Sequence, residues 1–243
     1  MISTRFRREI GRFRFDRFII FVLIVGAVLV GGKAWLARHP EHDPWAPLDL
    51  RDPPGWAMQD KLVALRGDPA SCAAVLDRSE IAYDRLEPAG EGACRRADRI
   101  ALTETVGFSP ARPDATCAVQ AAMALWVRQS LQPAAEEQLG SPVARIEHYG
   151  TFSCRRLYGA DEGAWSEHAT ANAIDLAAFV LEDGRRVSVL SDWNADDESA
   201  AFLRRIRDEA CPVFGTVLSP DYNEAHRDHL HFDQAARNWT FCR

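Results

Sequence analysis

The sequence predicts an α+β domain, with an antiparallel sheet and helices packed on one side, preceded by one N-terminal transmembrane helix. Strand-like segments lie before and after one amphipathic helix in the order β-β-β-α-β-β, which favours an antiparallel sheet. An Asp183-Gly184 pair between two of these segments is a strong hairpin signal. An apolar run near the N-terminus has the length that a bilayer-spanning helix needs.

The composition is that of a folded protein with an acidic main domain. Of the 243 residues, 47% are hydrophobic and 26% are charged, which excludes wholesale disorder and collagen-like structure. Residues 1–37 carry seven basic and two acidic side chains, a net +5, so the total of −6 leaves −11 for the rest. We expect no nucleic-acid partner, because phosphate binding needs clustered Lys and Arg.

The N-terminal third divides into three parts. Residues 1–17 form a basic tail, and residues 18–37 form an apolar helix in which Lys33 extends toward the interface. The basic flank predicts a cytoplasmic N-terminus and a main domain on the far side of the membrane. Cleavage as a signal peptide, near residues 32–34, is the competing interpretation. Residues 38–67 are rich in proline, which predicts an extended linker.

The folded domain is predicted over residues 68–243, starting at the Asp68-Pro69 helix signal. Its longest helical pattern should bend near Gln132, because Pro133 cannot continue the hydrogen-bond ladder, and should end at Gly140. The expected helices are 70–77, 114–139 and 196–210, and the expected strands are 81–86, 143–154, 172–180, 187–190, 213–218 and 229–232.

Cysteine usage indicates an oxidising compartment. All the cysteines lie beyond the apolar run, their number is even, and no CxxC pair suggests a zinc knuckle. Three disulfides are the economical interpretation. Fifteen pairings are possible, and chain order alone favours Cys72–Cys94, Cys117–Cys154 and Cys211–Cys242.

Two histidine motifs suggest a metal site. His168 precedes Asp175 by seven positions, and His229-x-His231 falls on a predicted strand, where side chains two apart face the same way. His168, Asp175 and His231 supply two imidazoles and a carboxylate. This is the ligand set of a catalytic Zn²⁺ with one position left open for water.

These motifs resemble those of known families. Ser166-x-His168-x6-Asp175 with Asp228-x-x-His231 resembles the zinc D-Ala-D-Ala peptidase and hedgehog signalling-domain superfamily. The segments YGTFSCR, SEHATANAIDLAAF and CPVFGTVLSPDYNEAHRDHLHFD are similar to the bacterial extensin-like C-terminal domain family, over roughly residues 72–243. The resemblance implies a periplasmic domain on the bacterial inner membrane, Zn²⁺ as cofactor, and peptidase-like action on peptidoglycan or its peptides.

The chain departs from the superfamily pattern at two positions. Ala171 stands where the pattern usually has Gly, and Asp228 stands where active peptidases tend to have Glu. His229 matches the histidine of the hedgehog-like and endopeptidase-like branches. The general base is therefore either Asp228 or His229.

Two further residues have implied roles in binding substrate. Arg155, or its neighbour Arg156, lies where the superfamily often has an arginine for a substrate carboxylate. Ser166 is expected to orient His168 or to lie at the pocket edge. The competing functional hypotheses are a non-catalytic, zinc-stabilised module that binds the cell wall or a protein, and a disulfide-stapled domain without metal.

Overall fold

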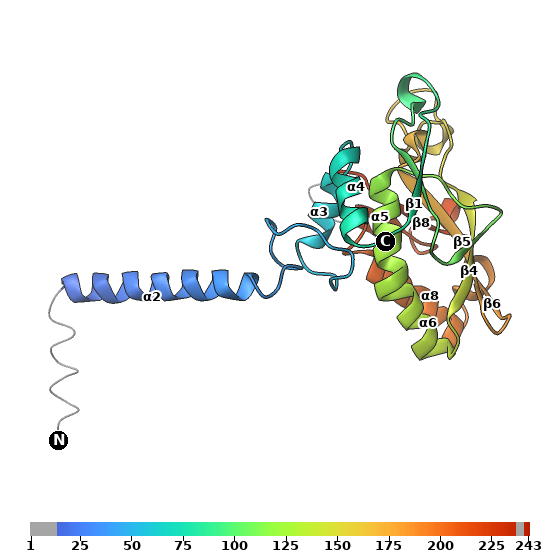
Figure 1. The fold of residues 1–243 in the computed structure, drawn as a ribbon. Coiled ribbons are helices and arrows are strands. Elements are labelled where there is room, and N and C mark those ends of the chain that lie inside the picture. Colours follow the sequence, from blue (N-terminus) through green and yellow to red (C-terminus); the bar gives the residue numbers. More distant parts are fainter. Residues whose placement is uncertain (1–13, 237–240) are drawn as a thin grey trace.

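The computed structural model describes residues 14–236 and 241–243 (Figure 1). A long helix, α2 (Arg14–Leu36), leads through an irregular segment into an α+β domain. Residues Phe15–Leu36 are long and apolar enough to cross a membrane, and their hydrophobic window is not buried against the protein. Residues 1–13, most of the predicted basic tail, lie outside the described residues.

The main sheet has seven strands in the described residues, in the order β3-β4-β5-β8-β7-β9, with β6 paired to β5. Its central pairs are antiparallel, as predicted. The edge strands β3 and β9 pair in parallel with β4 and β7. The β3–β4 pair is possible because a long helical crossover joins the two strands. The strands are β3 (Gly107–Ser109), β4 (Val143–Gly150), β5 (Ala173–Leu181), β6 (Arg186–Ser188), β7 (Thr216–Leu218), β8 (Leu230–Asp233) and β9 (Phe241–Cys242).

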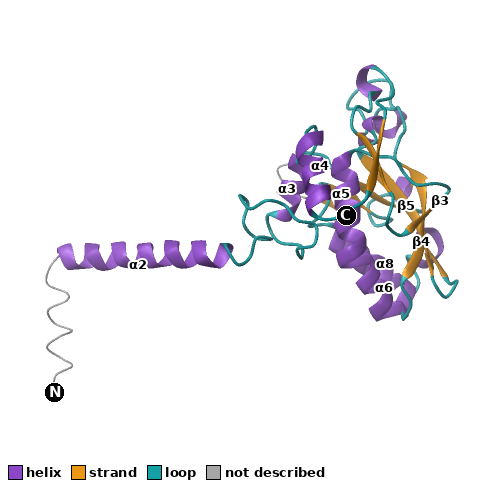
Figure 2. Ribbon diagram, viewed as in Figure 1, coloured by secondary structure: helices purple, strands orange, loops and turns teal. Residues whose placement is uncertain are grey.

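Helices lie on one side of this sheet, as Figure 2 shows for α5, α6 and α8. The predicted long helix is interrupted by a π-helical turn, η2, and Pro133 sits in the first turn of α6, directly after it. A separate two-stranded sheet pairs β1 (Tyr83–Leu86) with β2 (Arg99–Leu102). The helices of the domain are α3 (Met58–Ala64), α4 (Pro69–Arg78), α5 (Cys117–Trp126), η2 (Val127–Leu131), α6 (Gln132–Leu139), α7 (Val189–Asp192) and α8 (Glu198–Ala210).

Trp126 at the end of α5 joins the helical layer to the sheet. Its ring is fully buried and packs against Phe179 of β5 and Phe232 of β8, with ring centroids 6.3 and 5.2 Å away. Its indole N–H donates to the Ile206 carbonyl of α8 at 2.9 Å. The core therefore fixes the two strands that carry the candidate site.

Ordered structure begins before Asp68, the predicted start of the fold. Leu48 and Leu50 are buried, and the Leu50 N–H donates to Ser79 Oγ at 2.8 Å. Helix α3 adds the buried side chain of Leu62. The prolines exclude a regular helix over residues 39–56, but they do not prevent a series of turns that packs on the domain.

Three disulfides are present, and their pairing corrects the prediction. Cys72 joins Cys117, and Cys94 joins Cys154, so the pairings Cys72–Cys94 and Cys117–Cys154 were wrong. The reason is that α4 packs on α5, and the turn η1 (Gly92–Cys94) contacts the η4 region. Chain order carries no information on these contacts. The predicted bond between Cys211 and Cys242 is confirmed.

Candidate metal centre

Three elements bring His168, Asp175 and His231 together. His168 lies in the 3-10 turn η4 (Glu167–Thr170), Asp175 on β5 and His231 on β8. Asp175 and His231 are register partners on adjacent antiparallel strands, so their side chains leave the sheet on the same face.

The ligand atoms of these three residues form a compact triangle. Asp175 Oδ1 lies 2.9 Å from His231 Nδ1 and 3.2 Å from His168 Nε2, and the two nitrogens are 3.1 Å apart. Ligands at zinc-bond length in a tetrahedron are separated by about 3.3 Å. The buried His-Asp-His group therefore has the donor types and the spacing to bind one metal ion.

Hydrogen bonds on the far side of each imidazole support this conclusion. His168 Nδ1 donates to the Thr151 carbonyl at 3.1 Å, and His231 Nε2 donates to Asp233 Oδ2 at 3.0 Å. In the neutral form of each ring, the remaining nitrogen directs a lone pair at the carboxylate oxygen of Asp175. Three converging lone pairs repel one another unless a cation lies among them, and such outer partners are typical of metal-binding histidines.

The pKa shifts of Asp175 and His231 also indicate that the site favours positive charge. Burial raises the pKa of the Asp175 carboxyl, but hydrogen bonds to His168 and His231 outweigh it and hold this pKa well below its usual range. Burial lowers the pKa of His231, but its hydrogen bonds to Asp175 and Asp233 reverse the effect and raise it to about 10. Positive charge next to the Asp175 carboxylate is therefore favoured.

The 3-10 turn η4, just before β5, holds His168 in place. Ser166 precedes η4, and its Oγ accepts a hydrogen bond from the His168 N–H at 3.3 Å. Ala171 ends the turn in the left-handed region, with φ +56°. Glycine adopts this conformation freely, whereas it costs a residue with a Cβ about 1–2 kcal/mol.

The two candidates for general base occupy different places. The ring of His229 faces the triad, with Nε2 3.5 Å from Asp175 Oδ1, whereas Asp228 Oδ1 lies 2.9 Å from His229 Nδ1, on the opposite side of that ring. The Tyr149 hydroxyl donates to Asp228 Oδ2 at 3.4 Å. Asp228 therefore orients His229 and does not itself reach the triad.

Comparison with known proteins identifies the domain. A family model described as Extensin-like protein C-terminus matches residues 70–243, well over half of the chain. The chain belongs to this family. Searches of curated proteins and of solved structures found no match. All the half-cystines and the whole triad fall inside the matched extensin-like domain.

The triad opens into a cavity of the extensin-like domain with a volume of about 350 Å³. Arg155 and Ser166 line it, as does the aromatic ring of Trp165. Arg156 stacks on the Trp165 ring, 4.5 Å from its centroid, and donates to the Gly163 carbonyl. Of the two candidate arginines, Arg155 is the one that lines the cavity.

His226, which the sequence analysis did not single out, also lines the cavity. It ends the turn η5 (Glu224–His226), with its ring centroid 5.1 Å from that of His229 and 5.9 Å from that of His231. Burial and the neighbouring imidazoles lower its pKa to about 4, so it is neutral at pH 7. The available signal was its spacing, three residues before His229 in the same histidine-rich segment.

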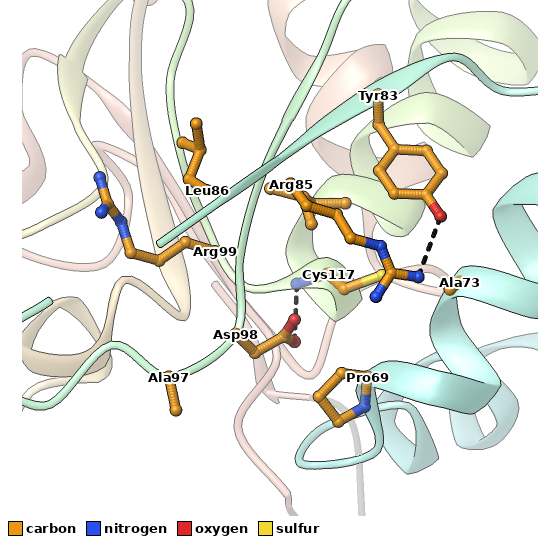
Figure 3. A pocket seen from close by; sticks show the side chains of 10 residues that line it. Pro69, Ala73, Tyr83, Arg85, Leu86, Ala97, Asp98, Arg99 and Cys117 are labelled. Carbon is orange, nitrogen blue, oxygen red and sulfur yellow. Dashed lines mark hydrogen bonds between the residues drawn. The ribbon is translucent and has the colours of Figure 1, made fainter. Parts of the chain in front are cut away.

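A second, smaller pocket lies beside the two-stranded sheet, between β1, β2 and the start of α4 (Figure 3). Asp98 is its carboxylate and accepts a hydrogen bond from the Cys117 N–H at 3.0 Å, while Arg85 donates to the Tyr83 hydroxyl at 3.4 Å. Burial raises the pKa of Asp98. Through its hydrogen bond to Cys117, Asp98 pairs one of the backbone N–H groups in the first turn of α5, next to the Cys72–Cys117 disulfide. This is a structural role.

Proposed function

We propose that this extensin-like domain is a zinc-dependent peptidase-like domain that acts on peptidoglycan peptides in the bacterial periplasm. Helix α2 would tether it to the inner membrane, with the N-terminus in the cytoplasm. The observation that carries the proposal is the triangle of His168, Asp175 and His231, with the Asp228-supported ring of His229 beside it in one cavity. The motif spacing supports a place in the zinc D-Ala-D-Ala peptidase and hedgehog signalling-domain superfamily.

His168, Asp175 and His231 would hold Zn²⁺, which when bound supplies Lewis-acid activation of water and of a peptide carbonyl. His229 is placed to take the proton of the attacking water at Nε2 and return it to the leaving amine. Asp228 fixes the orientation of His229 through Nδ1 and stabilises its charged form. The proposal therefore assigns the role of base to His229 and that of positioning residue to Asp228.

The rest of the cavity suits a peptide. The Arg155 side chain lies on its wall and provides a guanidinium that can bind a substrate carboxylate through two parallel hydrogen bonds. The Ser166 hydroxyl oxygen accepts a hydrogen bond from the backbone N–H of His168 in η4, so Ser166 supports His168 at the pocket edge. Peptidoglycan stem peptides carry free carboxylates, and a domain tethered outside the cytoplasm has access to them.

The test is digestion of purified muropeptides by the full chain loaded with Zn²⁺. We expect new fragments from the wild type and none from Asp175→Ala, which loses a metal ligand. His229→Ala should keep its zinc but lose activity by about 10²-fold or more, as expected on removal of a general base. Glu104→Gln, an exposed carboxylate change, is the matched control and should leave cleavage unchanged.

Two results would overturn the proposal that the domain is a peptidase. One is that the Asp175→Ala variant cleaves muropeptides as fast as the wild type, while its circular dichroism spectrum shows that it is folded. The other is zinc-loaded wild type that is retained on peptidoglycan without releasing fragments. The second result would support the non-catalytic, zinc-stabilised binding module, which the Ala at position 171 and the Asp in place of Glu at position 228 also favour.

A further inference from the structure

Three tryptophans are exposed where the chain leaves the apolar helix. Trp35 lies in the last turn of α2 and is 42% exposed, while Trp45 and Trp56 are 85% and 69% exposed. We call the segment from Trp35 to Trp56 the collar; in Figure 1 it forms the irregular chain between α2 and the domain. Soluble surfaces rarely leave several large aromatic rings open, whereas indole rings are enriched at the membrane–water interface.

The collar packs directly on the end of α2. The Trp35 ring stacks on His39 and His42, with centroids 4.5 and 5.4 Å away, and lies 5.7 Å from the ring of Trp56. The backbone N–H of Trp56 donates to His42 Nδ1 at 3.3 Å, and its indole N–H donates to the His42 carbonyl. These contacts leave no free spacer between the apolar helix and the first turns of the collar.

The collar is also packed on the domain and on itself. Leu48 and Leu50 are buried in the domain core, and Lys61 of α3 donates to the Pro40 carbonyl at 3.1 Å. Gly55 crosses the Glu41 backbone so closely that a Cβ would overlap the Glu41 carbonyl oxygen. Trp56 therefore sits on a packed scaffold next to the end of α2, and Trp45 lies in a turn of the same segment, where its N–H donates to Asp43 Oδ1 at 2.9 Å.

We propose that the collar seats on the lipid headgroup layer of the membrane that α2 crosses, with Trp45 and Trp56 inserted at the interface. The argument is continuity, because the same aromatic cluster begins on the apolar helix and ends at the domain. The charge of the collar specifies the lipid chemistry. It carries four acidic and two basic side chains, so the contact comes from the indole rings and needs no anionic lipid.

The experiment uses the full chain in phosphatidylcholine vesicles that contain lipids brominated on the acyl carbons nearest the headgroup. Bromine quenches tryptophan fluorescence only on close contact. We expect Trp45→Phe and Trp56→Phe each to reduce the quenchable part of the emission, leaving the contribution of Trp35 in the double variant. The matched control is Trp165→Phe, a ring with the same 42% exposure as Trp35, whose loss should leave the quenchable part unchanged.

Two further conditions test the lipid chemistry. Adding anionic phosphatidylglycerol, or raising the salt concentration, should change the quenching by less than about twofold. The reason is that salt screens interactions between charges, and the proposed contact is made by uncharged indole rings. The proposal is overturned if the Trp45→Phe and Trp56→Phe variants quench like the wild type, or if quenching appears only with anionic lipid. Absence of all quenching, including that of Trp35, would show that α2 is not inserted and would also overturn it.

Discussion

Asp175 and His231 face each other across β5 and β8, with 2.9 Å between the carboxylate oxygen and Nδ1. Their neighbours Ile174 and Phe232 are register partners on the opposite face and are buried in the core. A one-residue slip of β8 would turn His231 into the core and expose Phe232. The apolar packing under the sheet therefore sets the geometry of the polar site above it.

The hydrogen bond between His231 and Asp233 should contribute to metal affinity. Asp233→Asn removes the negative charge behind the imidazole, so we expect the Zn²⁺ dissociation constant to rise about 10–100-fold. Competition with a fluorescent chelator measures it. Asp183→Asn, a carboxylate change in the exposed β5–β6 turn, should leave the affinity unchanged. Equal affinities for Asp233→Asn and wild type would contradict a metal-supporting role for Asp233.

Metal uptake should release a proton. The pKa of His231 is raised from 6.5 to about 10, so its ring stays protonated at pH 7 in the metal-free protein. Zn²⁺ needs the unprotonated Nδ1, so protons compete with the metal below pH 10 and affinity falls as the pH falls, by about tenfold per pH unit near neutrality. Calorimetry in buffers of different ionisation enthalpy should find about one proton released per ion, and none released at pH 7 would contradict this assignment.

Local pattern was sufficient for much of the fold. The strand predicted over residues 172–180 is observed as β5, and the Asp183-Gly184 hairpin is confirmed. The spacing between His168 and Asp175, together with the His229-x-His231 pair, brought His168, Asp175 and His231 into one hypothesis, and the structure places them together. Their role as metal ligands stays a prediction.

Features that depend on packing between distant segments could not be predicted from the sequence. The partner of Cys72 follows from how α4 lies on α5, and nothing in the chain order encodes that contact. Leu48 and Leu50 are isolated apolar residues among prolines, so no periodicity marks them as core. The parallel edge strands β3 and β9 are too short to give an alternation signal.

The corrected disulfide pairing is open to direct mapping. Digestion without reduction should yield linked peptides that contain Cys72 with Cys117 and Cys94 with Cys154. The Cys72–Cys117 bond closes a separation of 45 residues, so the Cys72→Ala/Cys117→Ala double variant should lower the free energy of unfolding by about 4 kcal/mol through loop entropy. Urea unfolding in detergent measures the change. A linked peptide with Cys72 and Cys94 would contradict the structure.

Trp126 should be a determinant of both stability and site geometry. Trp126→Phe removes the buried indole hydrogen bond to the Ile206 carbonyl and opens space beside Phe232, so we expect the free energy of unfolding to fall by about 2–4 kcal/mol. The control is Trp165→Phe, at a partly exposed ring, which should change stability by about 0.5 kcal/mol or less.

The same variant tests how far the core determines the site. Phe232 is the neighbour of His231 on β8, so loosening its contact with Trp126 should weaken Zn²⁺ binding several-fold, even where the protein remains fully folded. Measuring the Zn²⁺ affinity by chelator competition, without urea and at low temperature, separates this effect from unfolding. If Trp126→Phe lowers stability but leaves zinc affinity at the wild-type value, β8 is held in register by its strand partners alone.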